Sequence, residues 1–167
     1  LGNHEFDYGM EQLSALLEKS EAQYLGCNIR YTGQGSSAVS SLKPYEMVSY
    51  GETEVAFVGV STPESIVKST PAYFMDESGE FVYDFYGGSG EELYAQVQKT
   101  VDECREKGAD YVIVLAHLGD DETSAPFRST DLIAGTTGID AVLDGHSHSV
   151  IPCDVVENQE GDKVLLS

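Results

Sequence analysis

Two short apolar runs, each followed by a histidine motif, constrain the fold of this chain more than any other feature. Tyr111 to Ala116 is nearly continuous in apolar side chains and precedes His117, and Asp140 to Asp144 precedes Gly145-His146-Ser147-His148. Such runs are typical of strands that are buried on both faces. Ser129 to Ala134 lies between them and predicts a short helix. This order predicts an α/β fold with a site at the carboxyl ends of its strands.

The helix predicted before these strands has one apolar face, formed by Leu93, Val97, Val101 and Cys104. A capping box of Ser89 and Glu92 begins this helix, and Lys107-Gly108 ends it. We therefore expect the helix to pack on the sheet.

Nearer the N-terminus the pattern predicts one more helix and several strands. The helix places Met10, Leu13, Leu16 and Leu17 at helical spacing, with Asp7 as its N-cap. A hairpin is expected at Gly51-Glu52, and the aromatic side chains near Phe74 are expected in the core. The predicted strands are Gln23 to Cys27, Tyr45 to Tyr50, Thr53 to Val60, a strand pair over Phe74 to Phe85, and Lys163 to Ser167.

All 4 histidines lie in three motifs rich in Gly, Asn and Asp, at or just past strand-like runs. Loops held by a rigid sheet commonly carry metal ligands and catalytic imidazoles. An amide oxygen and neutral imidazole nitrogens suit Zn, Mn or Fe better than Ca. The candidate metal ligands are Asn3, His117, His146 and His148.

His4 and Asp7 are three residues apart in a segment that leads into a helix. This spacing lets the carboxylate contact the imidazole and favour its charged form. An imidazolium held in this way can stabilise an oxyanion or protonate a leaving group. We therefore take His4 and Asp7 as candidate catalytic residues.

The composition narrows the range of partners. The chain has 29 acidic and 9 basic residues, a net charge of −20 and no Lys/Arg cluster, which argues against docking of nucleic acid. An anionic substrate would need local positive charge, which bound divalent cations supply. No apolar stretch approaches the roughly 20 residues of a membrane span. Cys27, Cys104 and Cys153 lack metal or redox spacing, and Cys27 and Cys104 are expected to be buried structural thiols.

The order of these motifs resembles a known family. Asn-His-Glu-x-x-Asp, then a histidine at a strand end, then Gly-His-x-His, is similar to the calcineurin-like metallophosphoesterases, and specifically to the catalytic domain of the 5′-nucleotidase family. The resemblance covers essentially the whole chain, through Gly2 to Gly9, Val58 to Val60 with Thr62-Pro63-Glu64, Leu115 to Gly119, and Gly138 to Ser149.

The resemblance implies a four-layer sandwich of mixed β-sheets flanked by helices. It also implies two divalent metal ions, and hydrolysis of nucleotide phosphate esters or 2′,3′-cyclic nucleotides by metal-activated water. Asn3, His117 and His146 match ligands of one metal and His148 matches a ligand of the other. His4 matches the histidine that stabilises the transition state, and Asp7 matches its partner. The family implies an extracellular, periplasmic or cell-surface location; Glu5 is expected only to hydrogen-bond within its loop.

The chain departs from the family in lacking the Asp-x-His strand and Gly-Asp segment that precede the Asn-His-Glu motif, and the C-terminal substrate-binding domain. We therefore expect a piece of a longer protein, with residues 1–167 forming one partial catalytic domain without a linker. The fold is expected to be incomplete at the N-terminus, and the chain to bind at most one metal ion with negligible turnover. We also expect unpaired sheet edges at Tyr111 to Ala116 and Ala141 to Asp144, favouring self-association.

Two alternatives remain open from the sequence. One is a metallohydrolase of a non-nucleotide substrate, such as a sugar-linked diphosphate or a sulfur compound. The other is a non-catalytic acidic binding module that retains the fold.

Overall fold

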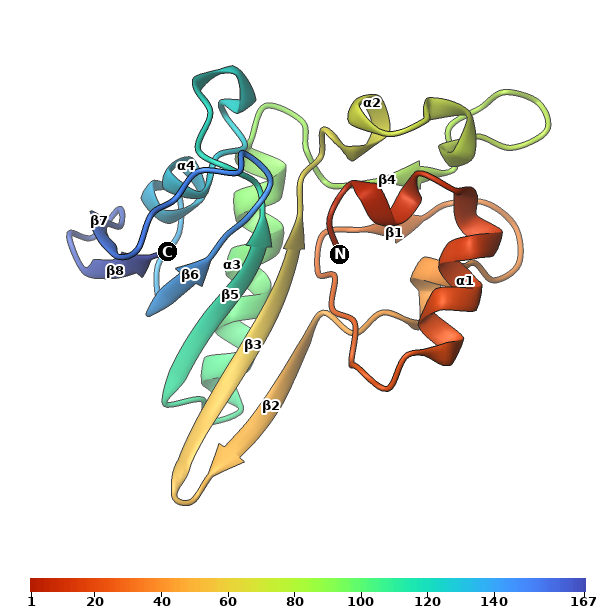
Figure 1. Ribbon diagram of the computed structural model, residues 1–167. Coiled ribbons are helices and arrows are strands. Elements are labelled where there is room, and N and C mark those ends of the chain that lie inside the picture. The colour runs from red at the N-terminus through yellow and green to blue at the C-terminus, as the bar shows by residue number, and fades with distance from the viewer.

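The computed structural model describes all of residues 1–167, which form two unequal parts joined side by side (Figure 1). The larger part is built on a six-stranded mixed sheet in the order β2-β3-β5-β6-β8-β7, and the smaller part holds α1 and a two-stranded sheet, β1-β4. The strands are β1 (Arg30–Tyr31), β2 (Tyr45–Tyr50), β3 (Thr53–Ser61), β4 (Tyr83–Asp84), β5 (Tyr111–His117), β6 (Ala141–Leu143), β7 (Asp154–Glu157) and β8 (Lys163–Leu166). The helices are α1 (Gly9–Lys19), α2 (Ser65–Lys68), α3 (Glu91–Glu106) and α4 (Ser129–Ala134), with 3-10 turns at His4–Phe6, Ala38–Ser41, Pro71–Phe74 and Glu122–Ser124.

The centre of the large sheet is parallel, as the strand, helix and strand pattern predicts. Val114 of β5 pairs with Val58 of β3 on one side and with Val142 of β6 on the other. β2 and β7 close the two ends of the sheet as antiparallel strands. The carboxyl ends of β3, β5 and β6 therefore lie along one edge. The α/β class with mixed sheets and flanking helices is confirmed.

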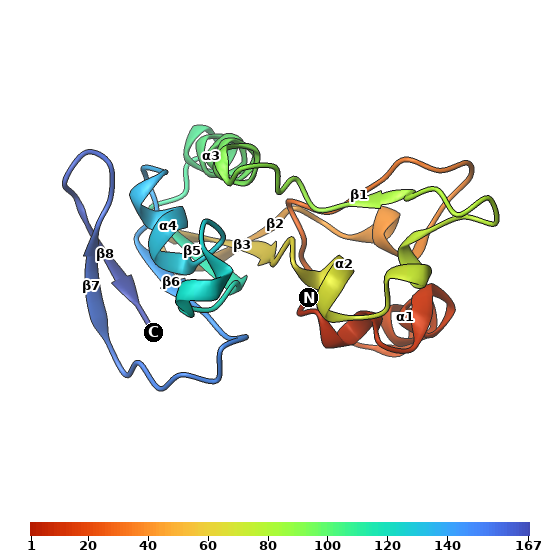
Figure 2. The ribbon, with the colours of Figure 1, turned by 90° about the horizontal axis from the view of Figure 1, so that it is seen from above.

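One face of this sheet carries the main hydrophobic core. Val112, Val114 and Val142 are fully buried there against α3, which lies along that face (Figure 2). The predicted apolar face of α3 is confirmed, since its members are all buried in this core. Fully burying one such side chain stabilises the fold by about 1.5–3 kcal/mol.

The opposite face of the sheet is open, which corrects the prediction of strands buried on both faces. Tyr111, Leu115, Leu143 and Leu165 are 40–53% exposed. An apolar run fits one-sided burial equally well when the second face also carries apolar residues.

The expected unpaired edges at β5 and β6 are likewise wrong. β5 lies between β3 and β6, and β6 lies between β5 and β8, so both strands are paired on both sides. Self-association through these edges therefore has no support in the structure.

The smaller part has its own core of aromatic and aliphatic side chains. Phe6 contacts Phe74 and Phe85 with ring centroids 5.2 and 5.6 Å apart, and Leu13 of α1 is buried beside them. The predicted core role of these aromatic residues is confirmed, although Phe81 is exposed. Instead of a strand pair over Phe74 to Phe85, a 3-10 turn, an isolated bridge and the short β4 place the rings.

Three further local predictions are corrected by the structure: the starts of α1 and α3, and the strand at Gln23 to Cys27. α1 follows Tyr8 as its N-cap, because the Asp7 carboxylate contacts His4 and Ser69 instead. α3 begins at Glu91 after Gly90, whose φ of 97° favours glycine, and not at Ser89. Gln23 to Cys27 forms one isolated bridge, because it crosses β3 so closely that a Cβ on Gly59 would lie 2.5 Å from the Leu25 backbone.

The cysteines behave as predicted where they are buried. Cys27 and Cys104 are buried free thiols, and burial raises the pKa of Cys27 to about 12 and that of Cys104 to about 11. Cys153 is exposed. No helix combines the length and apolar character needed to cross a membrane.

Candidate metal centre

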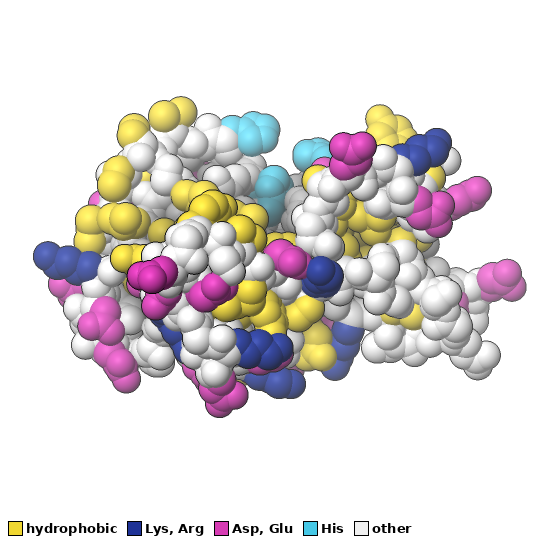
Figure 3. Space-filling view, turned by 90° about the horizontal axis from the view of Figure 1, so that it is seen from below, with side chains coloured by type: hydrophobic (Ala, Val, Ile, Leu, Met, Phe, Trp, Pro, Cys, Tyr) yellow, Lys and Arg dark blue, Asp and Glu magenta, His cyan; other side chains and the backbone are white.

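Three of the predicted ligands converge from loops that are far apart in the sequence. The Asn3 Oδ1 atom lies 3.0 Å from His117 Nε2 and 3.1 Å from His146 Nδ1. The two imidazole rings lie 5.0 Å apart at their centroids, and Asn3 is 3% exposed. Histidine side chains gather where the two parts of the molecule meet (Figure 3). The cluster therefore presents one oxygen and two nitrogen atoms to a common point.

The main chain just before Asn3 is held by close contacts with the larger part of the molecule. Ser61 at the end of β3 donates a hydrogen bond from its Oγ to the carbonyl oxygen of Leu1 (2.7 Å). A Cβ on Gly2 would lie 2.9 Å from the His117 ring, so a larger residue there would displace this ring. Glu5 accepts a hydrogen bond from the Gly2 N–H, which confirms the expected loop contact.

The two ligand histidines follow neighbouring parallel strands. His117 ends β5, and His146 lies in the loop after β6 with a φ of 85°. A non-glycine residue keeps this left-handed conformation only where the surrounding structure holds it in place. Here the hydrogen bonds of the Asp144 carboxylate hold the loop.

Asp144 joins the two histidine loops, a role that the sequence reasoning did not assign. Its Oδ1 accepts from the N–H groups of Leu118 (2.9 Å) and Gly145 (2.8 Å). Its Oδ2 accepts from the Gly119 N–H (2.9 Å) and from the Ser129 hydroxyl at the start of α4. The only sequence signal was the position of this aspartate between a buried strand and the Gly-His-x-His motif.

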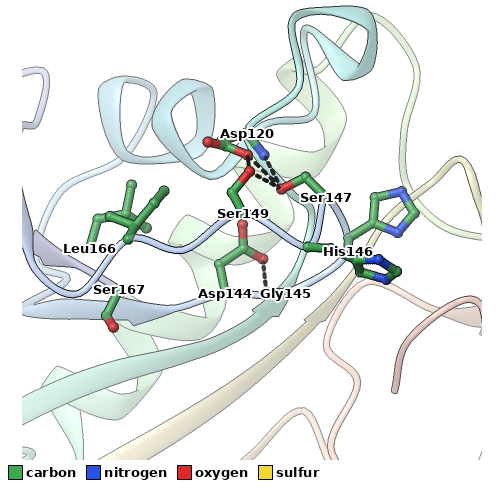
Figure 4. Close-up of a pocket in the computed structure, with 10 residues that line it drawn as sticks. Asp120, Asp144, Gly145, His146, Ser147, Ser149, Leu166 and Ser167 are labelled. Carbon is green, nitrogen blue, oxygen red and sulfur yellow. Dashed lines mark hydrogen bonds between the residues drawn. The ribbon is translucent and has the colours of Figure 1, made fainter.

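A small pocket lies beside His146 and is lined in part by Asp144 and Asp120 (Figure 4). Asp120 accepts hydrogen bonds from the hydroxyls of Ser147 and Ser149, which lower the pKa of its carboxyl group. These contacts link the segment after β5 to the loop that carries His146.

The structure does not bring His148 to the other three ligands. Its side chain is exposed, it lines the small pocket, and it makes no hydrogen bond to Asn3, His117 or His146. Its φ of 58° places it on the same strained loop as His146. A ligand role for His148 therefore stays a prediction.

The predicted pair of His4 and Asp7 is formed in the segment that directly follows Asn3. His4 Nδ1 lies 2.6 Å from Asp7 Oδ2, and Ser69 donates to Asp7 Oδ1 at 2.9 Å. The hydrogen bond with His4, followed by that with Ser69, lowers the pKa of the Asp7 carboxyl. The His4 side chain is 71% exposed, so it can meet a ligand from solvent.

Burial favours the neutral form of the converging histidines. It lowers the pKa of His117, with a further contribution from His146, and it lowers the pKa of His146, with a further contribution from Lys68. Neutral imidazole is the form that binds metal. The set of one amide oxygen and two imidazole nitrogens fits Zn, Mn or Fe. No group of three or more His, Cys, Asp and Glu side chains is placed to hold an ion, so Asn3 is essential to this set.

The comparison with protein families decides the assignment. The family model for the bacterial capsule synthesis protein PGA_cap matches residues 2–164. The chain belongs to the PGA_cap family. Its relatives and structural neighbours also place this PGA_cap chain among the calcineurin-like phosphoesterases of the 5′-nucleotidase family, as its motifs predicted.

The PGA_cap chain is 31% identical to the snake venom 5′-nucleotidase of Naja atra, over 90% of this chain and 25% of that protein. It is 30% identical to the 2′,3′-cyclic-nucleotide 2′-phosphodiesterase/3′-nucleotidase of Salmonella typhimurium, over 91% of this chain and 23% of that protein. The crystal structure of a 5′-nucleotidase precursor from Thermus thermophilus matches with a TM-score of 0.75 and 26% identity, covering 100% of this chain and 32% of that one. The chain thus spans about a quarter of the length of these curated relatives.

Proposed function

We propose that the protein is a metal-dependent phosphoesterase that hydrolyses phosphate esters of nucleotides. The observation that carries this proposal is the convergence of Asn3, His117 and His146 beside the His4–Asp7 pair. The names of the relatives support nucleotides as the substrate class. A net charge of −20 repels phosphate, so a cation at this cluster would supply the attraction that the chain as a whole lacks.

In the proposed mechanism Asn3, His117 and His146 would hold one divalent ion. When bound, such an ion acts as a Lewis acid on a phosphoryl oxygen and lowers the pKa of a bound water. Asp7 holds Nδ1 of His4 and leaves Nε2 facing solvent, where it can donate a proton to the leaving oxygen. Ser69 keeps Asp7 in place. His148 would serve a second ion, together with groups outside residues 1–167.

Two properties of the longer protein belong to the same proposal, its location and a further domain. We place it outside the cell, in the periplasm or at the cell surface, and give it a further domain that binds the substrate. The short coverage of the relatives supports such a domain.

A panel of esters tests the reaction. We expect the full-length protein with Mn²⁺ to hydrolyse AMP or 2′,3′-cyclic AMP faster than a sugar-linked diphosphate or glycerol phosphate, and to lose activity in a chelator. Release of inorganic phosphate measures hydrolysis of AMP and glycerol phosphate, and chromatography of the monophosphate products measures ring opening of 2′,3′-cyclic AMP and cleavage of the sugar-linked diphosphate. The PGA_cap description favours a second candidate, a non-nucleotide ester from capsule material. Preference for the non-nucleotide esters would support that candidate, and no turnover of any ester would contradict the proposed function.

A metal titration tests the centre itself. We expect one zinc ion per 167-residue chain, bound more tightly than Ca²⁺ or Mg²⁺ because two ligands are nitrogen atoms. Isothermal titration calorimetry at about pH 7.5 and about pH 5 gives the pH dependence. The pKa values of His117 and His146 both lie below the ordinary 6.5, so protons compete with zinc for these imidazole nitrogens only at lower pH. We therefore expect zinc affinity to be retained near pH 6.5 and to be lost below it. Calcium affinity equal to that of zinc would contradict this donor set.

A further inference from the structure

Glu64 has an unexplained position next to the candidate metal centre. It lies just before α2, with its side chain 17% exposed. Its Oε2 atom is buried and accepts no hydrogen bond. Two nitrogen atoms nevertheless lie close to this oxygen. Lys68 Nζ is 3.0 Å away and forms an ion pair with it, but its orientation does not make a hydrogen bond. His146 Nε2 is 3.8 Å away. A buried carboxylate oxygen without a donor is costly, so it calls for an explanation.

The two nitrogens of His146 face different partners. Nδ1 points to Asn3, in the direction of the converging donors, and Nε2 lies 3.2 Å from Lys68 Nζ. In this arrangement Nε2 accepts from the ammonium group, so the ring proton is on Nδ1. A metal ion at Nδ1 requires the opposite tautomer, with the proton on Nε2.

The change of tautomer would leave two donors facing each other, Nε2–H and the Lys68 ammonium group. Glu64 Oε2 is the acceptor nearest to that new N–H and has a free lone pair. Metal-bound histidines usually donate their other N–H to a carboxylate or carbonyl, which fixes the ring and raises its basicity. The structure places the Glu64 carboxylate, the His146 imidazole and the metal-binding Nδ1 atom in the order that this arrangement requires.

We propose that Glu64 is a positioning residue that accepts the Nε2–H of His146 when Nδ1 binds a metal ion, while Lys68 favours the tautomer that does not bind. This inference rests on the proposed metal centre and adds a pair of residues from α2 and its N-terminal side to it. Glu64 and Lys68, which lie one helical turn apart, thus have opposite effects on metal affinity: Glu64 strengthens binding, and Lys68 weakens it.

Zinc affinity of the full-length protein, measured by calorimetry, tests the pair. Glu64→Leu should weaken zinc binding by about 10–100-fold. Glu64→Gln should restore most of it, because the amide oxygen still accepts. Lys68→Met should tighten binding by about twofold to fivefold, the effect of one partly exposed charge. Glu103→Leu is the matched control, because it removes another Glu–Lys pair of the same spacing on α3 and should leave zinc affinity unchanged.

Nitrogen-15 NMR of labelled histidine supplies a readout that a merely structural role would not move. In wild-type protein, zinc should shift the His146 proton from Nδ1 to Nε2 and place that proton in a strong hydrogen bond. Glu64→Gln should weaken this hydrogen bond even if Glu64→Leu fails to fold. If wild-type protein binds no zinc, the proposed function fails. If it binds zinc and Glu64→Leu folds and binds equally well, or Lys68→Met weakens binding, only the present inference is overturned.

Discussion

We expect His4→Ala to lower kcat of the full-length protein by about 10²–10⁴-fold, the range of a lost general acid, without changing its metal content. His4 is hydrogen-bonded to Asp7 and exposed to solvent, and it makes no hydrogen bond to the converging atoms of Asn3, His117 and His146. Its loss therefore removes a proton donor and leaves the metal ligands in place. Steady-state kinetics and elemental analysis of the same sample measure both quantities.

His117→Ala is the matched comparison for this prediction. It removes a nitrogen that lies 3.0 Å from Asn3 Oδ1, so we expect it to strip the metal as well as the activity. Asp7→Asn should fall between wild type and His4→Ala in kcat, since it weakens the hold on the His4 ring without removing the imidazole. A loss of metal in His4→Ala with retention in His117→Ala would reverse the two roles.

The parts of the fold that sequence reasoning identified were those with a strong local signal. The run from Tyr111 to Ala116 predicted β5, and the apolar face from Leu93 to Cys104 predicted α3, because burial against a sheet imposes these patterns. The same runs also placed His117 and His146 together, since carboxyl ends of neighbouring parallel strands share one edge.

Features that depend on long-range contact were not predictable. The open face of the sheet was missed because Leu115 and Leu143 are apolar whether or not anything covers them. The strand pair over Phe74 to Phe85 was wrong because aromatic residues can reach a core from turns as well as from strands. Glu64 and Lys68 lie at a helix of 4 residues, too short for any periodic signal, and only the folded chain brings them to His146.

The second large effect is expected at Asp144. Its two oxygens accept from three backbone N–H groups and one hydroxyl, and these donors belong to the loops that carry His117 and His146 and to α4. Asp144→Asn keeps the shape of the side chain but replaces one oxygen by an NH₂ group. Each oxygen accepts at least one backbone N–H, so either orientation of the amide sets two donors against each other.

We therefore expect Asp144→Asn to lower the free energy of unfolding by about 1–3 kcal/mol, the cost of leaving partly buried donors unsatisfied. Because the same bonds hold both ligand histidines, zinc affinity should also fall, by about 10–100-fold. Urea denaturation of the metal-free protein and zinc calorimetry measure the two effects separately. Asp120→Asn is the control: this carboxylate also links the two loops, but it accepts only from the hydroxyls of Ser147 and Ser149 and from no backbone N–H of either loop, so both effects should be smaller. Wild-type zinc affinity in a destabilised Asp144→Asn protein would mean that this carboxylate supports the fold without orienting the metal ligands.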